Sequence, residues 1–255
     1  TVARLASLLP AGGASASTTP FAVLGGPQVA RSWSPPCHAR VFGALGRDAV
    51  FAALGDDDWA ALWSAFGRSP FGGFAVTAPH KAQAREVARR VMDGFDPGVA
   101  NTLLREGGGW ACANTDGPAV RELVEASIGG LSGVSAAVFG CGGAGRAVAA
   151  AFDQAGCGTA LLGRGETALE GTRVLVNATS ADPDEPPREI LRSLAPGALV
   201  VDMEVDPPVT PLLRDAMAVG GHVVTGDEMF RGQGRRQARL LNDSGSADAA
   251  AVAFD

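Results

Sequence analysis

The 255-residue chain has no tyrosine and only one lysine, Lys81, among its 21 basic residues. Arginine stays protonated in proteins, whereas the pKa of a lysine shifts readily with burial and with neighbouring charges. Among the lysine and arginine side chains, Lys81 is therefore the only one that is suited to proton transfer. Asparagine is also scarce and occurs only at positions 101, 114, 177 and 242. Both scarce residue types are candidates for function at the positions where they remain.

The chain also lacks a basic surplus, long hydrophobic runs and paired cysteines. Its net charge of −6 opposes binding to nucleic acid or to an anionic membrane. No apolar run approaches the roughly 18–20 residues of a membrane span, and the apolar stretch near the N-terminus is too short for a signal peptide. The four cysteines form no CxxC pair and no metal-ligand pattern. We therefore expect a cytoplasmic protein with reduced, mostly core cysteines and no metal site.

Strand and helix signals alternate along most of the sequence. Short apolar runs predict strands at 21–25, 48–54, 73–76, 100–105, 110–113, 135–139, 159–162, 173–176, 198–201 and 222–224. Helical spacing predicts helices at 35–45, 57–66, 79–91, 118–126, 143–155, 210–219 and 227–241. This alternation predicts the α/β class, with parallel sheets covered by helices in two successive units. We expect a flexible lead-in over 1–19 and a loosely attached tail from 244 onward.

A glycine-rich loop follows the predicted strand 135–139 and opens the next helix. It reads Gly140-Cys-Gly142-Gly143-Ala144-Gly145. In this context the first glycine permits a tight turn, the second lets the backbone approach a pyrophosphate, and the third lets the helix pack on the strand. The helix N-terminus offers N–H donors to the phosphates. The alternative is an ordinary turn in a chain with 35 glycines, but the strand–turn–helix context favours a dinucleotide site.

The choice between NAD and NADP depends on the end of the next predicted strand. The sequence there is Gly163-Arg164-Gly165-Glu166. Arg164 is suited to a 2′-phosphate and favours NADP, whereas Glu166 favours NAD if the loop folds back toward the ribose. We expect NADP, with NAD as the alternative.

Polar motifs in the first unit close strands or open helices, where α/β folds place ligand contacts. Lys81 and Asp116 lie in two of these motifs. Asp116 is the natural carboxylate partner for the ammonium group of Lys81. The alternative makes Lys81 a solvated lysine and Asp116 a helix N-cap. His38 and His80 lie in the same motifs, and we interpret both as structural hydrogen-bonding residues. Hydroxyl, amide and amine groups of this kind suit a polyhydroxylated ligand with a carboxylate.

The ordered motifs together resemble the shikimate dehydrogenase family over residues 21–241. They are Gly25-x-Pro27, Ser32-x-Ser34-Pro35-x-x-His38, Val76-Thr77-x-Pro79-His80-Lys81, Asn101-Thr102, Asn114-Thr115-Asp116-Gly117, the glycine loop, Asn177-Ala178-Thr179, Asp202-Met203, Pro208-x-Thr210-Pro211-Leu212-Leu213, and Gly226-x-x-Met229 followed by Gln233. Each is weak alone, but the ordered series is specific.

The resemblance implies roles for residues of this chain. Ser32 and Ser34 would bind the substrate carboxylate, and the ring hydroxyls would be bound by Thr77, Asn101 and Gln233. Lys81 and Asp116 would form the catalytic pair. The cofactor would contact Gly140, Gly142, Gly143, Ala144, Gly145, Arg164, Thr179, Met203, Gly226 and Met229. The implied reaction is the reversible reduction of 3-dehydroshikimate to shikimate in aromatic amino-acid biosynthesis, by a monomer or homodimer.

The resemblance also implies a two-domain fold. A substrate domain at 20–117 would be joined by the C-terminal helix region 229–255, and a Rossmann-type dinucleotide domain would occupy 118–228, with the cleft between them. Only ten residues separate Leu162 from Arg173, too few for a full crossover helix and a further strand. We therefore expect a shortened parallel sheet that has lost its edge strand.

Two other departures leave the substrate and the activity open. Val205 stands where the family usually has a tyrosine near the substrate, and the acidic stretch 182–186 replaces the usual Gly-Met after the Asn177 motif. Quinate or an amino-shikimate is therefore an alternative substrate. A catalytically weak binding or regulatory module is the alternative to an active enzyme, because the cofactor region is trimmed.

Overall fold

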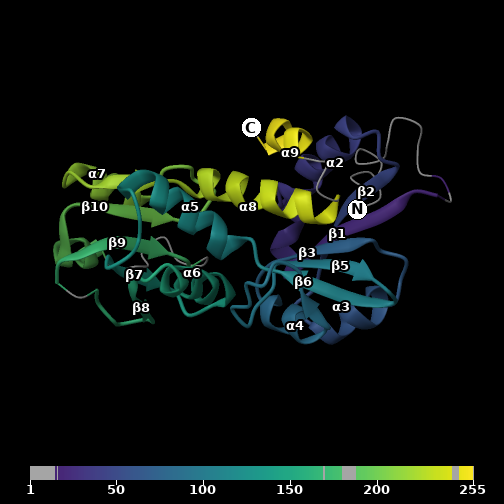
Figure 1. Ribbon diagram of the computed structural model, residues 1–255, viewed down its shortest axis with the longest axis horizontal. Helices are drawn as coiled ribbons and strands as arrows, with labels where there is room; N and C mark the ends of the chain where they lie inside the picture. The colour runs from purple at the N-terminus through teal and green to yellow at the C-terminus, as the bar shows by residue number, and fades with distance from the viewer. Residues whose placement is uncertain (1–14, 16, 169, 180–187, 243–246, 255) are drawn as a thin grey trace. The chain divides into compact units, whose positions relative to one another are not determined.

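The computed structural model describes residues 15, 17–168, 170–179, 188–242 and 247–254. Contacts between residues divide the chain into two compact units (Figure 1). The first comprises Thr1–Thr115 together with Gly234–Asp255, and the second comprises Asp116–Gln233. The boundary near the C-terminus falls inside α8 (Gly226–Leu241), so this helix contributes residues to both units.

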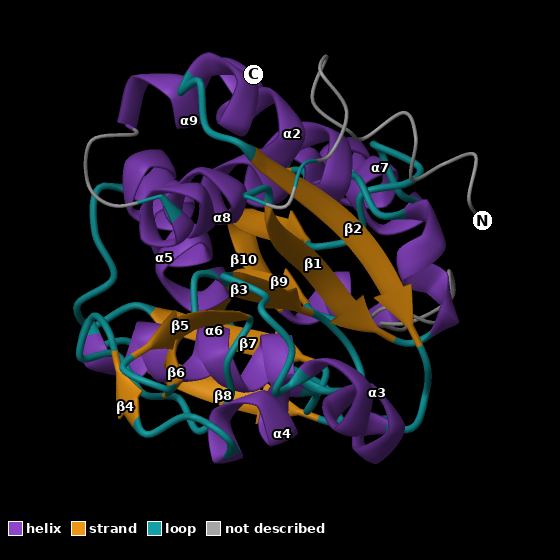
Figure 2. Cartoon of the chain, turned by 90° about the vertical axis from the view of Figure 1, so that its right-hand side faces the viewer, coloured by secondary structure: helices purple, strands orange, loops and turns teal. Residues whose placement is uncertain are grey.

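The first unit is built on a six-stranded mixed sheet with the order β2-β1-β3-β5-β6-β4 (Figure 2). β1 (Thr19–Gly25) pairs in parallel with both β2 (Ala49–Gly55) and β3 (Gly73–Val76). β5 (Thr102–Glu106) and β6 (Gly109–Ala113) form an antiparallel hairpin. The turn between them uses Gly107 and Gly108, both at positive φ.

Alternating side chains of this sheet face two layers of helices. Ala22, Leu24 and Phe74 pack with the aromatic residues of α3 (Trp59–Phe66) and with Ala84 of α4 (Lys81–Glu86). Phe21, Val23 and Phe51 pack with Phe42 of α2 (Ser34–Ala44) and with Leu241 of α8. The period-two alternation of a strand thus places helices on both faces, and it buries the core on each side of the sheet.

The second unit contains a five-stranded sheet with the order β11-β10-β9-β7-β8, in which every pairing is parallel. Its strands are β7 (Ser135–Phe139), β8 (Gly158–Leu162), β9 (Thr172–Asn177), β10 (Leu194–Asp202) and β11 (His222–Val224). β8 lies at one edge of this sheet, and the described residues between Leu162 and Thr172 form no helix or strand. The predicted loss of the edge strand is confirmed.

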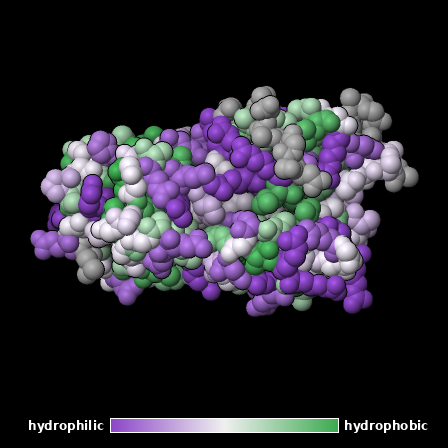
Figure 3. All heavy atoms as spheres, viewed as in Figure 1, coloured by the Kyte–Doolittle hydropathy of each residue, from purple (hydrophilic) through white to green (hydrophobic). Residues whose placement is uncertain are grey.

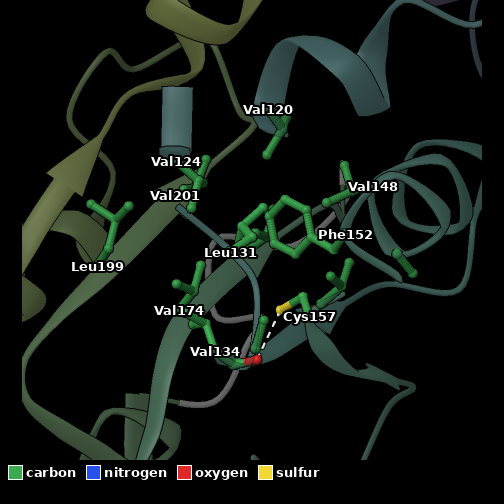
Figure 4. Close-up of a cluster of buried hydrophobic side chains, with 14 of the residues drawn as sticks. Val120, Val124, Leu131, Val134, Val148, Phe152, Cys157, Val174, Leu199 and Val201 are labelled. Carbon is green, nitrogen blue, oxygen red and sulfur yellow. Dashed lines mark hydrogen bonds between the residues drawn. The ribbon is translucent and has the colours of Figure 1, made fainter. Parts of the chain in front are cut away.

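Helices cover both faces of this second sheet. α5 (Asp116–Ile128) and α6 (Gly143–Gln154) pack on one face, where Phe152 is surrounded by valines of both helices and of the strands (Figure 4). The thiol of Cys157 donates a hydrogen bond to the Val134 carbonyl oxygen at 3.1 Å beside this cluster (Figure 4). α7 (Pro211–Ala218) and the 3-10 helix η2 (Arg188–Ser193) pack on the other face. This is a doubly wound, Rossmann-type arrangement.

Two of the sequence expectations about local structure are wrong. The predicted helix 79–91 is shorter, because the Thr77–His80 turn precedes α4 and because β4 (Arg90–Val91) pairs with β6. The tail is not loosely attached, since α9 (Ala247–Phe254) packs against α2. Phe254 is 4% exposed and meets the His38 ring edge-on at a centroid distance of 5.5 Å. Most of the expected lead-in lies outside the described residues, as does the acidic stretch 182–186.

Few large hydrophobic side chains of the described residues are exposed, and Trp33 and Val219 are the most exposed of them. On the face shown in Figure 3, hydrophobic residues are scattered among hydrophilic ones. In the part of the chain that the structure describes, no helix has both the length and the hydrophobicity for a membrane crossing.

Candidate active site

Lys81 is the first residue of α4, directly after the turn that closes β3. The His80 ring fixes this turn through a 2.7 Å hydrogen bond between its Nε2 and the Asp56 carbonyl oxygen. The carbonyl oxygen of Lys81 accepts a hydrogen bond from the Ala100 N–H at 2.8 Å. The lysine backbone is therefore held beside the segment that leads into β5, and its side chain is half-buried.

Asn101 is the centre of a buried hydrogen-bond network in the first unit. Its Oδ1 accepts from the Thr115 N–H at 3.0 Å and from the Thr102 hydroxyl at 2.9 Å. Its Nδ2 donates to the Thr115 hydroxyl oxygen at 2.8 Å. Since both acceptor contacts fix the carbonyl end, the orientation of this amide is determined. Asp116, which is 4% exposed, follows Thr115 directly in the chain and begins α5.

Gln237 of α8 extends this network, although no motif of the sequence marks it as a site residue. Its Nε2 donates to the Asn101 carbonyl oxygen at 2.9 Å and to the Thr102 hydroxyl oxygen at 3.0 Å. The sequence indicates Gln237 only by its position four residues after Gln233, because residues one helical turn apart lie on the same face of a helix. Gln233 itself is 8% exposed, belongs to the second unit, and donates to the Phe230 carbonyl oxygen at 3.2 Å.

The expectation that His38 and His80 are structural is confirmed. The His38 ring is fully buried, stacks on Phe51 at a centroid distance of 4.3 Å, and meets Gln237 Oε1 through Nε2 at 3.1 Å. Burial lowers the pKa of His38 to about 4. A group that stays neutral over the physiological pH range is suited to positioning and not to acid–base chemistry at that pH.

Ser32 and Ser34 flank the start of α2. Ser32 is half-buried, Ser34 is 8% exposed, and the Ser34 N–H donates to the Ser32 hydroxyl oxygen at 3.2 Å. Thr77 directly follows β3, and its N–H donates to the Leu24 carbonyl oxygen at 2.9 Å. These residues belong to the same unit as Lys81 and Asn101.

The glycine loop of the second unit has the geometry that a pyrophosphate requires. Gly140 has a φ of +114°, and its N–H donates to the Leu162 carbonyl oxygen at 2.8 Å. A Cβ on Gly145 would lie 1.8 Å from the Gly140 carbonyl oxygen, so only glycine allows α6 to pack this closely. A Cβ on Gly142 would meet nothing within 4 Å. Gly142 is the N-cap of α6, with no side-chain hydrogen bond capping the helix, so the loop fits a dinucleotide phosphate.

A hydrogen-bond network that the sequence does not predict fixes Thr179 and Met203 after the carboxyl ends of β9 and β10. Asn177 accepts from the Thr179 hydroxyl at 2.7 Å and donates to Asp202 at 3.0 Å. Asp202 also accepts from the Thr210 hydroxyl at 2.6 Å, and it is 1% exposed. The Met203 N–H donates to the Asn177 carbonyl oxygen at 3.0 Å. In the sequence, only the scarcity of asparagine pointed to Asn177, and through it to its partner Asp202.

Gly226 and Met229 lie in the first turn of α8. A Cβ on Gly226 would lie 2.0 Å from the Glu204 carbonyl oxygen, so α8 begins in close contact with the chain after β10. The Thr225 N–H and the Glu228 carboxylate are 2.8 Å apart, and the Glu228 N–H reaches the Thr225 hydroxyl at 3.4 Å. This capping box fixes the helix start. Met229 is buried in the core of the second unit.

The cysteines and acidic residues add no metal centre among the residues that the structure describes, where no three His, Cys, Asp or Glu side chains gather as ligands. All four cysteines are free. Cys112 and Cys157 are buried, Cys37 is half-buried and Cys141, in the glycine loop, is exposed, so only half of them are core residues. Burial raises the pKa of the Cys112 thiol to about 11, which makes it a poor nucleophile.

Comparisons with known proteins agree with this geometry. Residues 24–103 match the family model of the shikimate dehydrogenase substrate binding domain. The chain is 31% identical to shikimate dehydrogenase (NADP(+)) of Syntrophobacter fumaroxidans, with 85% of each chain covered. The chain belongs to the shikimate dehydrogenase family. It is also 32% identical to the Halobacterium salinarum enzyme of the same name, with 84% of this chain and 90% of that one covered.

Solved structures of the shikimate dehydrogenase family share the fold. Shikimate 5-dehydrogenase from Thermus thermophilus, in complex with NADP(H) and shikimate, superposes with a TM-score of 0.75 at 33% identity, over 92% of this chain and all of that one. The resemblance and the two-domain α/β fold inferred from the ordered motifs are thus confirmed.

Proposed function

We propose that this protein is an NADP-dependent shikimate dehydrogenase that interconverts shikimate and 3-dehydroshikimate in aromatic amino-acid biosynthesis. The single observation that carries the proposal is the position of the only lysine of the chain. Lys81 begins α4 and is hydrogen-bonded through its backbone to the segment that holds Asn101. The family membership and the names of the relatives support the same activity.

Lys81 moves the proton in the proposed reaction. Oxidation of a secondary alcohol removes a hydride from carbon and a proton from the hydroxyl oxygen, and Nζ of Lys81 accepts that proton. Asp116 orients the lysine and the hydroxyl through its carboxylate. In the reverse direction the same ammonium group returns the proton to the carbonyl oxygen. NADP⁺, when bound, would be the acceptor for the hydride.

The remaining polar residues orient the substrate. Ser32 and Ser34 offer hydroxyl donors to its carboxylate, and Thr77, Asn101 and Gln233 contact its ring hydroxyls. Asn101 suits this role because its amide is already fixed by Thr102 and Thr115. A preorganised amide loses little conformational entropy when it binds a ligand.

The cofactor contacts belong to the second unit. The glycine loop 140–145 and the start of α6 hold the pyrophosphate, and Arg164 holds the 2′-phosphate of NADP. Met203, Gly226 and Met229 line the nicotinamide side, and Thr179 is a further cofactor contact. The contacts that fix Thr179 and Met203 are made by Asn177 and Asp202, two buried side chains that bind each other.

The assay that tests the proposal follows the absorbance of the reduced nicotinamide with shikimate and either NADP⁺ or NAD⁺, and identifies the product. Formation of 3-dehydroshikimate is the expected result. Quinate and an amino-shikimate are assayed in parallel, because Val205 replaces a tyrosine hydroxyl of the family and suits a different ring substituent. Turnover of one of these compounds but not of shikimate would contradict the proposed substrate.

A binding or regulatory module is the second candidate, and the missing edge strand beside β8 is the observation that favours it. Such a module would bind shikimate without hydride transfer, so calorimetric binding in the absence of turnover would replace the enzyme proposal. A cytoplasmic location and a monomeric or homodimeric state complete the proposal. Gel filtration with light scattering measures the state.

A further inference from the structure

Glu166 folds back onto the end of the edge strand β8. The Gly163 N–H donates to Glu166 Oε2, and the Glu166 N–H donates to the Gly163 carbonyl oxygen at 3.2 Å. Gly165, at a φ of +83°, provides the left-handed residue that this reversal needs. The turn 163–166 is therefore closed at both ends, and the carboxylate of Glu166 lies at the carboxyl end of β8.

This carboxylate lies beside the phosphate-binding loop. A Cβ built on Gly163 would lie 3.3 Å from Glu166 Oε2 and 3.7 Å from the sulfur of Cys141, which is part of the glycine loop. The Leu162 carbonyl oxygen accepts from the Gly140 N–H at 2.8 Å, so the strand end and the loop are joined. In dinucleotide-binding folds, this junction lies against the adenosine ribose.

We propose that Glu166 contacts the 2′ position of the cofactor ribose and lowers the preference of this protein for NADP over NAD. The proposal rests on the proposed function. A carboxylate here accepts a hydrogen bond from a ribose 2′-hydroxyl and repels a 2′-phosphate. Arg164, two residues earlier in the same turn, has the opposite effect. The turn thus combines one group that favours each cofactor, and both NADP and NAD are accepted.

Adenosine 2′,5′-bisphosphate and 5′-AMP test this inference without any catalytic step, because they differ only in the 2′-phosphate. Their affinities are measured by calorimetry for the wild type and for Glu166→Gln, Arg164→Gln and Asp153→Asn. Glutamine at 166 keeps an acceptor for the Gly163 N–H and removes only the charge. Asp153 is exposed at the far end of α6 from the loop and serves as the charge-matched control.

We expect Glu166→Gln to raise the affinity for the bisphosphate relative to 5′-AMP by about tenfold. Arg164→Gln should lower this ratio, and Asp153→Asn should leave it unchanged. An unchanged ratio in Glu166→Gln, with an unaltered thermal midpoint, would overturn the inference. If the ratio shifts as expected but no variant oxidises shikimate, the proposed function fails and the role of Glu166 stands. The ratio of kcat/KM for NADP⁺ and NAD⁺ should follow the affinity ratio in an active enzyme.

Discussion

The Nε2 of His38 lies 3.1 Å from Oε1 of Gln237. Because the glutamine oxygen can only accept, the imidazole carries its proton on Nε2, and the glutamine nitrogen is left to face β5. That nitrogen donates to the Asn101 carbonyl oxygen and to the Thr102 hydroxyl. A fully buried histidine on α2 therefore sets the direction of a hydrogen-bond chain that ends at the amide of Asn101.

Replacing Gln237 with leucine should weaken substrate binding more than catalysis. The substitution removes the donor to Thr102 and leaves Nε2 of His38 without its acceptor, at a cost of about 1–3 kcal/mol in the free energy of unfolding. Asn101 then loses part of its fixed orientation, so KM for shikimate should rise about fivefold while kcat changes less. Steady-state kinetics and chemical denaturation measure the two effects.

Gln154→Leu is the matched control for this change, since Gln154 is exposed on α6 and should alter neither KM nor stability. A Gln237→Leu protein with reduced stability and unchanged KM would show that Gln237 stabilises the fold without positioning Asn101.

Acid should destabilise the protein through His38. Its pKa is about 4 in the folded protein and 6.5 in the unfolded chain, so only the unfolded state binds the proton between these values. Above pH 6.5, His38 therefore does not change the free energy of unfolding. As the pH falls from 6.5 to 4, protonation of His38 in the unfolded chain lowers the free energy of unfolding, by about 3 kcal/mol in total. Denaturation midpoints of the wild type and His38→Gln across this range should converge as the pH falls.

The control is a substitution of the same kind at an exposed position, His222→Gln. An identical acid dependence in His38→Gln and the wild type would contradict the role of the buried imidazole.

Two glycines of the phosphate loop should respond differently to alanine. Gly145→Ala places a methyl group 1.8 Å from the Gly140 carbonyl oxygen, and it should lower stability by about 2 kcal/mol or more. Gly142→Ala meets no protein atom within 4 Å and should leave the thermal midpoint unchanged. It should still weaken cofactor binding, because the added methyl group stands where the backbone approaches the pyrophosphate. Unchanged cofactor affinity in Gly142→Ala would place the pyrophosphate elsewhere.

Lys81→Arg separates charge from proton transfer. Arginine keeps the positive charge but cannot give up its proton near neutral pH, so kcat should fall by about 10²–10⁴. The dissociation constant for shikimate, measured by calorimetry, should change much less. Retention of wild-type kcat would show that Lys81 acts by electrostatics alone.

Much of the architecture could be predicted because it depends on local patterns. The continuous apolar runs of β7, β9 and β10 predict strands of a parallel sheet covered by helices, and neighbouring side chains of these strands do face opposite helix layers. The short interval between Leu162 and Arg173 likewise predicted the missing edge strand.

Features that depend on distant partners could not be predicted. β4 forms because Arg90 and Val91 pair with β6, and nothing in the helical spacing of 79–91 indicates this pairing. α9 is held by contacts with α2, including the ring of His38. The link from His38 to Asn101 through Gln237 joins residues far apart in the sequence. The sequence favours NAD through Glu166 only if the loop folds back, and the Glu166 side chain does fold back onto the end of β8.

We propose that this protein oxidises shikimate with Lys81 as the proton acceptor. Comparing the wild type with Lys81→Met tests this, by reduced-nicotinamide absorbance with shikimate and NADP⁺, both at millimolar concentration. We expect a steady rise in absorbance for the wild type and none above background for the variant, although both bind shikimate. Binding of shikimate by the wild type without any rise, with either NADP⁺ or NAD⁺, would show that the protein is not a shikimate dehydrogenase.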